Sequence, residues 1–417
     1  MQNCKITEQH SLASWVAFLL IVLTGHAAHA QEKPTFFLEG FATVKAYGLT
    51  TTTGGGNAPV TVVKTPQEFL TAAERSDIAD KKSRNNTPRV IRIANDLDLG
   101  VLANERGGND LKSVGIVHVR PHTSIFAAGA GATLHHGTIE MHGAANVIIR
   151  NLKFRDLWEF DPTGKYDRFG WDFVRITNSG KEHSHHIWVD HCDFTKAYDG
   201  ALDITHGSDL VTVSWCRFGG DDSGPHKKVM LIGHSSSTGA AATDAGRLNV
   251  TLQHNFFQNI SDRAPRVRFG NVHAYNNFID GAENATISVM KAVTLVENCF
   301  YRDARIATTF SHAADSVKKD HTGTLVVVNS RNESPRVAAP AASGKEYPNR
   351  AFEMEHNFKG SVERSALAFN APAEWTWEAR NKLPYDYKLD PVDAVPALLS
   401  KFTGTGKLPE SELPKQQ

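Results

Sequence analysis

Apolar residues recur in the central part of the chain as an eight-residue pattern, with apolar side chains at positions one, three and eight. Six copies are present, and they begin at Val147, Ile187, Val211, Val250, Val272 and Val293. Their starts are 40, 24, 39, 22 and 21 residues apart. Spacings near 22 residues are typical of one coil of a parallel β-helix, and the two near 40 indicate a coil with a large inserted loop. The pattern therefore predicts an all-β chain folded as a right-handed parallel β-helix.

Coils of such a helix stack about 4.8 Å apart, so residues at one pattern position form a column along the axis. Position six holds Leu152, Cys192, Cys216, Asn255, Asn277 and Asn298. We expect the consecutive asparagines to hydrogen-bond to one another, because a buried amide without a partner is costly. A β-sandwich of similar strands would need a hairpin turn about every 8 to 12 residues. Such turns are largely missing.

Two segments outside the repeat have helical character. Residues 66–75 follow a glycine-rich turn and predict a short helix that covers the first open strand edge. Residues 391–402 begin with Pro391, a residue favoured at the first turn of a helix, and predict a packed terminal helix. Beyond residue 330 the pattern fades into irregular chain rich in Pro and Ala. We therefore expect an N-terminal capping helix, an irregular C-terminal region and protection of both ends of the repeat.

The first 30 residues have the pattern of a secretory signal peptide. Lys5 precedes an apolar run over residues 12–24, and the small residues at 28–30 provide a cleavage site before Gln31. The run is too short for a permanent membrane span, and a retained membrane helix is the less favoured alternative. We therefore expect residues 31–417 to form a single, secreted β-helix domain with no membrane attachment in the mature form.

Charge and cysteine content add little. The chain has 45 basic and 45 acidic residues and a formal net charge of +0, so the charge balance does not favour nucleic acid as a partner. We also expect the protein to be a monomer. Outside the signal segment the cysteines form an odd set, Cys192, Cys216 and Cys299. Cys192 and Cys216 either form a disulfide or stack as small core residues, and the sequence leaves both open.

Three aspartates form a candidate metal site. Asp199 and Asp203 are four residues apart, and Asp172 lies one coil earlier. In an extended strand, residues four apart are about 13 Å apart, too far to share one ion. The chain must therefore bend at Gly200 if both aspartates bind it. A set of oxygen ligands favours Ca²⁺ over Zn²⁺, although a solvated turn would also carry such residues.

A basic cluster follows the acidic one. Arg263 precedes Pro265, and a strand that starts after the proline places Arg266 and Arg268 on one face. Lys228 lies in the preceding coil. We expect these side chains to form a cationic surface, since no matching acidic run lies nearby in the sequence; unpartnered surface charges are the alternative.

Two further polar stretches, residues 188–191 and 208–215, are predicted to be structural, because their polar residues occupy column positions. His191 and His254 share position five. We expect them to be stacked histidines rather than metal ligands.

Together these motifs resemble the pectate lyase superfamily, strongly over residues 146–280. The motifs that carry the resemblance are Trp188-Val-Asp-His191, Asp199-Gly-Ala-Leu-Asp-Ile204, Gly207-Ser-Asp-Leu-Val-Thr-Val-Ser-Trp215, Lys228-Val-Met-Leu-Ile-Gly-His234, Val250-Thr-Leu-Gln-His-Asn255 and Arg263-Ala-Pro-Arg-Val-Arg-Phe-Gly-Asn-Val-His-Ala-Tyr-Asn-Asn277. Weaker echoes occur at residues 39–41 and 53–55.

The resemblance implies a parallel β-helix, a Ca²⁺ cofactor and polygalacturonate as substrate. By matching positions it implies that Asp172, Asp199 and Asp203 hold calcium. It also implies that Lys228 and Arg268 bind the substrate carboxylate with Arg266 beside them, and that Arg263 is the base. Arginine is an unusual base because its side chain is ordinarily always protonated. Some relatives carry another acid two residues before the first ligand, where this chain has Gly170.

These implications describe a β-elimination, in which a base removes the C5 proton of a galacturonate and the glycosidic oxygen leaves C4. Two alternatives stay open. A hydrolase on the same fold would need a pair of acid and base carboxylates at the cleaved bond. An exported polysaccharide-binding protein or adhesin would need no chemistry, because one fold hosts many functions.

Overall fold

The β-helix lies within Leu38–Gln417, one of two units into which the chain divides. The computed structural model describes residues 34–73, 86–102, 105–106, 113–157, 171–178, 182–197, 199–220, 228–318, 321–333, 356–357 and 383–414. The predicted signal peptide and Gly170 lie outside these residues.

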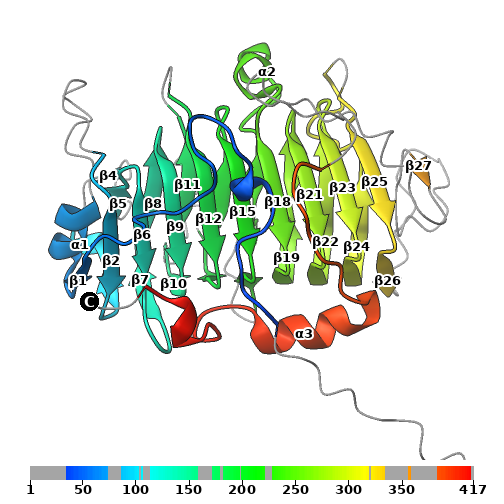
Figure 1. The fold of residues 1–417 in the computed structure, drawn as a ribbon. Helices are drawn as coiled ribbons and strands as arrows, with labels where there is room; N and C mark the ends of the chain where they lie inside the picture. The colour runs from blue at the N-terminus through cyan, green and yellow to red at the C-terminus, as the bar shows by residue number, and fades with distance from the viewer. Residues whose placement is uncertain are drawn as a thin grey trace, which may run out of the picture. The chain divides into compact units, whose positions relative to one another are not determined.

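The first sheet is a ladder of parallel strands that runs the length of the coils (Figure 1). Its eleven strands in the described residues are, in spatial order, β1 (Val60–Val63), β2 (Arg89–Ile93), β6 (Thr123–Phe126), β9 (Ala145–Arg150), β12 (His185–Asp190), β15 (Asp209–Ser214), β18 (Asn249–Gln253), β21 (Asn271–Tyr275), β23 (Val293–Glu297), β25 (Thr324–Val328) and β27 (His356–Asn357).

The second sheet turns a corner and so supplies two further ladders. One consists of β3 (Leu97–Asp98), β7 (Ala132–His135), β10 (Leu152–Arg155), β13 (Asp193–Thr195), β16 (Arg217–Gly219) and β19 (Phe256–Asp262). The other consists of β4 (Glu105–Arg106), β5 (Ser113–His118), β8 (Gly137–His142), β11 (Val174–Thr177), β14 (Leu202–Ile204), β17 (Leu231–Ile232) and β20 (Arg266–Arg268). All described pairs in these ladders are parallel except β4 with β5.

The corner is the long strand β22 (Phe278–Val289), whose first half pairs with β19 and whose second half pairs with β20. It also pairs with β24 (Phe300–Thr309), which pairs in turn with β26 (Arg331–Glu333). Each coil thus contributes to three ladders around a shared core, which confirms the predicted parallel β-helix and excludes the β-sandwich.

Five of the six predicted repeats align as expected. Val147, Ile187, Val211, Val250 and Val272 pair in register along the first ladder. The sixth is wrong by one residue, because Val272 pairs with Thr294 instead of Val293.

The position-six column therefore ends at Cys299 in place of Asn298. Asn255 Nδ2 donates to Asn277 Oδ1 at 3.1 Å, and Asn277 Nδ2 lies 3.7 Å from Cys299 Sγ. Alternation could not decide the register of β23, since both of its faces are apolar: Val293 and Leu295 pack in a second cluster outside the coil.

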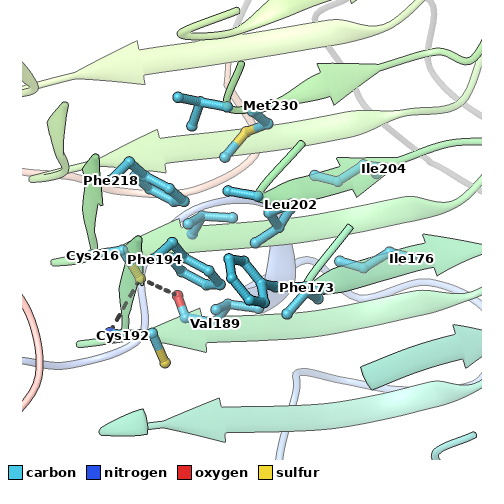
Figure 2. Close-up of a cluster of buried hydrophobic side chains, with 14 of the residues drawn as sticks. Phe173, Ile176, Val189, Cys192, Phe194, Leu202, Ile204, Cys216, Phe218 and Met230 are labelled. Atoms are coloured by element: carbon cyan, nitrogen blue, oxygen red, sulfur yellow. Dashed lines mark hydrogen bonds between the residues drawn. The ribbon is translucent and has the colours of Figure 1, made fainter. Parts of the chain in front are cut away.

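Aromatic rings from β10, β13, β16 and β19 stack inside the coils, and Figure 2 shows two of them, Phe194 and Phe218, among other buried side chains. Phe154, Phe194, Phe218 and Phe257 stack with centroids 4.9, 4.8 and 5.0 Å apart. Such rings, one per coil, form a rigid platform beneath the outward side chains.

The cysteines and histidines of the repeat also stack. Cys192 and Cys216 are free thiols, buried in adjacent coils. Of the two alternatives, a disulfide or stacked core residues, the structure therefore supports stacked core residues. Trp215 lies between His191 and His254, with ring centroids 5.9 and 4.2 Å away. The two histidines therefore belong to one stack, as expected, with an indole between them.

The helices confirm one prediction about the ends and correct another. Helix α1 (Pro66–Ala73) buries Phe69 and Ala73 against the first coils, as predicted for a cap. Helix α3 (Val395–Phe402) follows a 3₁₀ turn over Val392–Ala394 and buries Leu398 and Leu399. It does not cover the far end, because the chain after it returns to the earlier coils, where Thr405 N donates to Asp193 Oδ2.

The remaining helices are short. Within the described residues they are α2 (Thr238–Asp244) and 3₁₀ turns over Phe41–Thr43, Leu99–Val101 and Glu410–Glu412. In the part of the chain that the structure describes, no helix has the length and apolar character needed to cross a membrane.

Candidate functional site

The predicted site residues gather on one outward surface, which we call the site face: the ladder β5, β8, β11, β14, β17 and β20 with the turns that enter its strands. Asp172 precedes β11, Asp203 lies in β14, Lys228 precedes β17, and Arg266 and Arg268 lie in β20. Side chains alternate along a strand, so Val174, Ile204 and Val267 enter the core while their neighbours face outward.

Gly200 brings two of the aspartates together. A Cβ at this residue would lie 2.7 Å from Asp172 Oδ1 and 3.0 Å from Asp203 Oδ1, so a larger residue would displace the carboxylates. The Gly200 amide donates to Asp172 Oδ1 at 2.7 Å, and the Leu231 amide donates to Asp203 Oδ1 at 3.0 Å. The approach of the Asp172 and Asp203 carboxylates to this turn therefore depends on the missing side chain of Gly200, whereas the bend that would join Asp199 to Asp203 stays a prediction.

The two buried carboxylates create an unfavourable concentration of negative charge. Burial and the charges of Asp203 and Asp199 raise the pKa of Asp172 well above its ordinary value. Burial also raises the pKa of Asp203, to about 7, although the Arg263 guanidinium opposes the shift. A bound cation would relieve this repulsion, which is the condition expected of ligands that meet at a metal.

Asp199 is less closely held. The backbone amide of Asp199 donates to the carbonyl oxygen of Trp171, the residue before Asp172, at 3.2 Å. Asp199 Oδ1 pairs with Lys228 Nζ at 3.2 Å, and both side chains are about a quarter exposed, 23 and 25 %. The structure therefore places the ammonium group of Lys228 at the edge of the acidic group.

The ligand atoms of the three aspartates do not all lie within 4.8 Å of one another. Among the residues that the structure describes, one group of three His, Cys, Asp or Glu side chains has donor atoms all within 4.8 Å of one another, and it is His118, Glu140 and His142. Binding of one ion by all three aspartates therefore requires Asp199 to turn from Lys228 toward Asp172 and Asp203. All their donors are oxygens, which fits a hard cation such as Ca²⁺.

Arg263 stands between the acidic and basic groups. It follows β19 in a left-handed conformation with φ of 73°, and its guanidinium acts on the carboxylate of Asp203. Its Nε and Nη1 are buried and have no hydrogen-bond partner within the described part of the chain. A buried donor without a partner is costly, and such groups cluster where a ligand completes them.

Arg266 and Arg268 do not form the open cationic surface expected from the sequence. Both are buried, and Asp315 joins them: Arg266 Nη2 lies 2.9 Å from its Oδ2 and Arg268 Nε lies 2.9 Å from its Oδ1. Burial tends to raise the pKa of Asp315, but the two guanidinium groups hold it below its ordinary value. The expectation failed because the acidic partner comes from a distant part of the chain.

Sequence reasoning also missed a row of alternating charge across the site face. Glu140, Arg175 and Asp203 are register partners on β8, β11 and β14. Arg175 Nε lies 2.8 Å from Glu140 Oε2, and its charge also acts on Asp172 and Asp203. Arg175 was visible beside Asp172 in the sequence, but only the strand register shows which residues it meets.

The fold and this face define a parallel β-helix protein with a cluster of buried carboxylates and guanidinium groups on one outer ladder. The chain belongs to the pectate lyase family, whose sequence profile matches residues 10–347. Pectate lyases are polysaccharide lyases, so the chain is an enzyme of that class.

Individual relatives agree with this assignment. The chain is 33% identical over 293 residues to pectate lyase B of Paenibacillus amylolyticus, covering 55% of this chain and 72% of the relative. It is 29% identical over 409 residues to a pectate trisaccharide-lyase of Thermotoga maritima, covering 97% and 96%. The solved structure of the pectate lyase pelN from Paenibacillus sp. 0602 has the same fold, with a TM-score of 0.67, 24% identity and coverage of 89% and 96%.

Proposed function

We propose that this chain is a secreted, calcium-dependent pectate lyase that cleaves α-1,4-linked polygalacturonate by β-elimination. The observation that carries the proposal is the position of Arg263, whose buried Nε and Nη1 have no partner in the described residues and whose guanidinium acts on Asp203. A group with unsatisfied polar atoms beside a cluster of buried acids has the character of a reactive centre.

The reaction assigns one role to each group. Arg263, in its neutral form, takes the C5 proton of a galacturonate, the electrons of that C–H bond form a C4–C5 double bond, and the C4–O bond breaks with its electron pair on the leaving oxygen. The leaving oxygen must gain a proton, for which we name no residue. Lys228 and Arg268 bind the carboxylate attached to C5 and stabilise the charge that develops there.

The chain's own contacts prepare these roles. Asp315 orients Arg268, and Lys228 is kept near the acids by Asp199. Arg266 lies behind Arg268 on the same buried acid. In this proposal Asp172, Asp199 and Asp203 hold Ca²⁺, which would neutralise the substrate carboxylate and so make the C5 proton easier to remove.

Export and domain organisation complete the proposal. The signal pattern supports cleavage after residue 30 and a single β-helix domain over residues 31–417 that acts as a monomer outside the cell. The amino-terminal sequence of protein recovered from the medium tests this part, with Gln31 expected as the first residue.

Product formation tests the activity itself. Purified protein incubated with unesterified polygalacturonate at fixed Ca²⁺ and ionic strength should release 4,5-unsaturated oligogalacturonides, detected by ultraviolet absorbance. Highly methylated pectin should react far more slowly, because each lost charge-assisted contact costs about 1.5 to 3 kcal/mol. Saturated products would indicate a hydrolase. The absence of any product would favour a polysaccharide-binding protein or adhesin. Faster cleavage of methylated pectin would reassign the chain as a pectin lyase.

A further inference from the structure

A second group of metal-ligand side chains lies on the site face, away from the aspartates. It consists of His118 at the end of β5 and of Glu140 and His142 on β8. One donor atom of each lies within 4.8 Å of the donors of the other two. The mechanism proposed above uses none of these residues.

The strand register brings the three side chains together. His118 is the register partner of Glu140, so the two are neighbours across the ladder. Glu140 and His142 are two residues apart on one strand and face the same way, while Met141 between them is fully buried in the core. Rigid strands therefore position all three, as a preformed site requires.

The distances match the edges of a coordination polyhedron. His118 Nδ1 lies 3.0 Å from Glu140 Oε1, and His142 Nδ1 lies 3.4 Å from the same oxygen. Bonds of about 2.0 to 2.1 Å to a tetrahedral zinc ion place neighbouring ligand atoms about 3.3 Å apart. The two distances to Glu140 Oε1 therefore already suit ligands of one small cation, and all three donors lie within 4.8 Å of one another.

The contact between His118 and Glu140 is close but lacks the geometry of a hydrogen bond. His118 Nδ1 is buried and makes no hydrogen bond of acceptable geometry with any group in the described chain, although Glu140 Oε1 is 3.0 Å away. A hydrogen bond needs its proton near the line between the two atoms. A cation placed off that line would satisfy both the ring nitrogen and the carboxylate.

The surroundings complete a metal site. Glu140 Oε2 lies 2.8 Å from Arg175 Nε, which leaves Oε1 directed toward the two imidazoles. Contacts of this kind from outside the ligand set orient metal ligands. The side chains of His118 and His142 are 25 and 31 % exposed, so an ion can enter from solvent and keep a water molecule as a further ligand.

We propose that His118, Glu140 and His142 form a second metal site that takes a first-row transition-metal ion such as Zn²⁺. Imidazole nitrogens favour such ions over Ca²⁺, so the site differs in chemistry from the aspartate site. It lies two strands away, since Glu140 and Asp203 flank Arg175 in the ladder. The proposal does not depend on the lyase activity.

Metal titration of untagged, chelator-treated protein tests the site directly. We expect the wild type to bind one equivalent of Zn²⁺ by calorimetry, and to show the visible absorption of tetrahedral Co²⁺ when cobalt is used. Loss of an outer partner of a metal ligand weakens binding about 10- to 100-fold, so His118→Ala with His142→Ala should weaken it at least about 100-fold. Glu140→Gln, which keeps the side-chain shape, should also weaken it.

Two controls separate this site from other metal binding. His135→Ala with His136→Ala removes two histidines that pair with different aspartates, Asp156 and Asp98, and should leave the zinc equivalent intact. Asp199→Ala with Asp203→Ala should also retain it. The proposal is overturned if the wild type binds no zinc equivalent, if the His118 and His142 variant binds as tightly as the wild type, or if the aspartate variant loses it.

Discussion

Asp315 accepts a hydrogen bond from Arg268 Nε at 2.9 Å although the two residues are 47 positions apart in the chain. The same carboxylate pairs with Arg266, and the side chains of all three are at most 11 % exposed. A buried charge needs a partner, so Asp315 both permits burial of the two guanidinium groups and fixes the direction of Arg268.

Replacement of Asp315 by asparagine should therefore destabilise the fold. The change leaves two buried guanidinium groups without their counterion, and breaking a buried ion pair from one side costs about 3 to 5 kcal/mol. Denaturant unfolding measures the loss, and the activity that remains should show a raised KM because Arg268 is no longer held. The matched control is Glu283→Gln, which removes an exposed pair with Arg305 and should cost at most about 1 kcal/mol. Equal stability of the two variants would contradict the structural role of Asp315.

Activity should depend on Ca²⁺ bound by the aspartates. Excess chelator should abolish turnover and added Ca²⁺ should restore it. Asp199→Ala or Asp203→Ala should raise the Ca²⁺ concentration for half-maximal rate by about 10- to 100-fold, the loss expected for one charge-assisted contact. Asp280→Ala, which removes a carboxylate paired with Arg302 on another ladder, should leave the requirement unchanged. Full activity in excess chelator would refute the calcium requirement.

Substitution of Arg263 by lysine should reduce kcat by about 100- to 10,000-fold, the contribution typical of a general base. The charge is kept, so KM should change little. Arg305→Lys, on the exposed surface of β24, is a control that should behave as the wild type. Arg266→Lys should lower stability more than rate, since Arg266 is bound to Asp315. Near-normal turnover by Arg263→Lys would remove this residue from the mechanism.

Acid should destabilise the protein in part through a buried pair of histidines. Burial, followed by the neighbouring charge of His186, lowers the pKa of His185 to about 3, and burial lowers the pKa of His186 to about 4. Between pH 6.5, the ordinary value, and about 3, the unfolded chain binds more protons than the fold, so stability falls as pH falls. The other titratable groups near His185 are His183, His122, Arg247 and Tyr47.

His185→Gln tests this source of pH dependence, because glutamine cannot take up the proton. The melting temperature of the variant should fall less steeply than that of the wild type between pH 6.5 and pH 4. His136→Gln replaces a histidine that is about a quarter exposed, 26 %, and paired with Asp98; it provides the comparison and should keep the wild-type slope. An unchanged slope in His185→Gln would show that the acid sensitivity has another origin.

Much of the fold followed from the periodicity of the sequence. A coil of about 22 residues repeats its apolar positions, and this repetition alone predicts stacked parallel strands. It predicted the register of Val147 through Val272, which pair with one another along the first ladder. It failed at Val293 because that strand carries apolar residues on both faces. The sequence then does not show which face enters the core, so the register of the strand cannot be deduced from it.

The candidate site divides in the same way. The sequence by itself singled out the residues to which we assign the chemistry in our proposal, since Asp199, Gly200 and Asp203 lie together in one motif and Arg263 in another. Only the tertiary structure decided their partners. Stacking of coils places residues about 4.8 Å apart that are 20 to 40 positions apart in the chain, and a later segment supplies Asp315. The pairing of Arg268 with Asp315 and the meeting of His118 with Glu140 are therefore properties of strand register and chain return, which no local motif encodes.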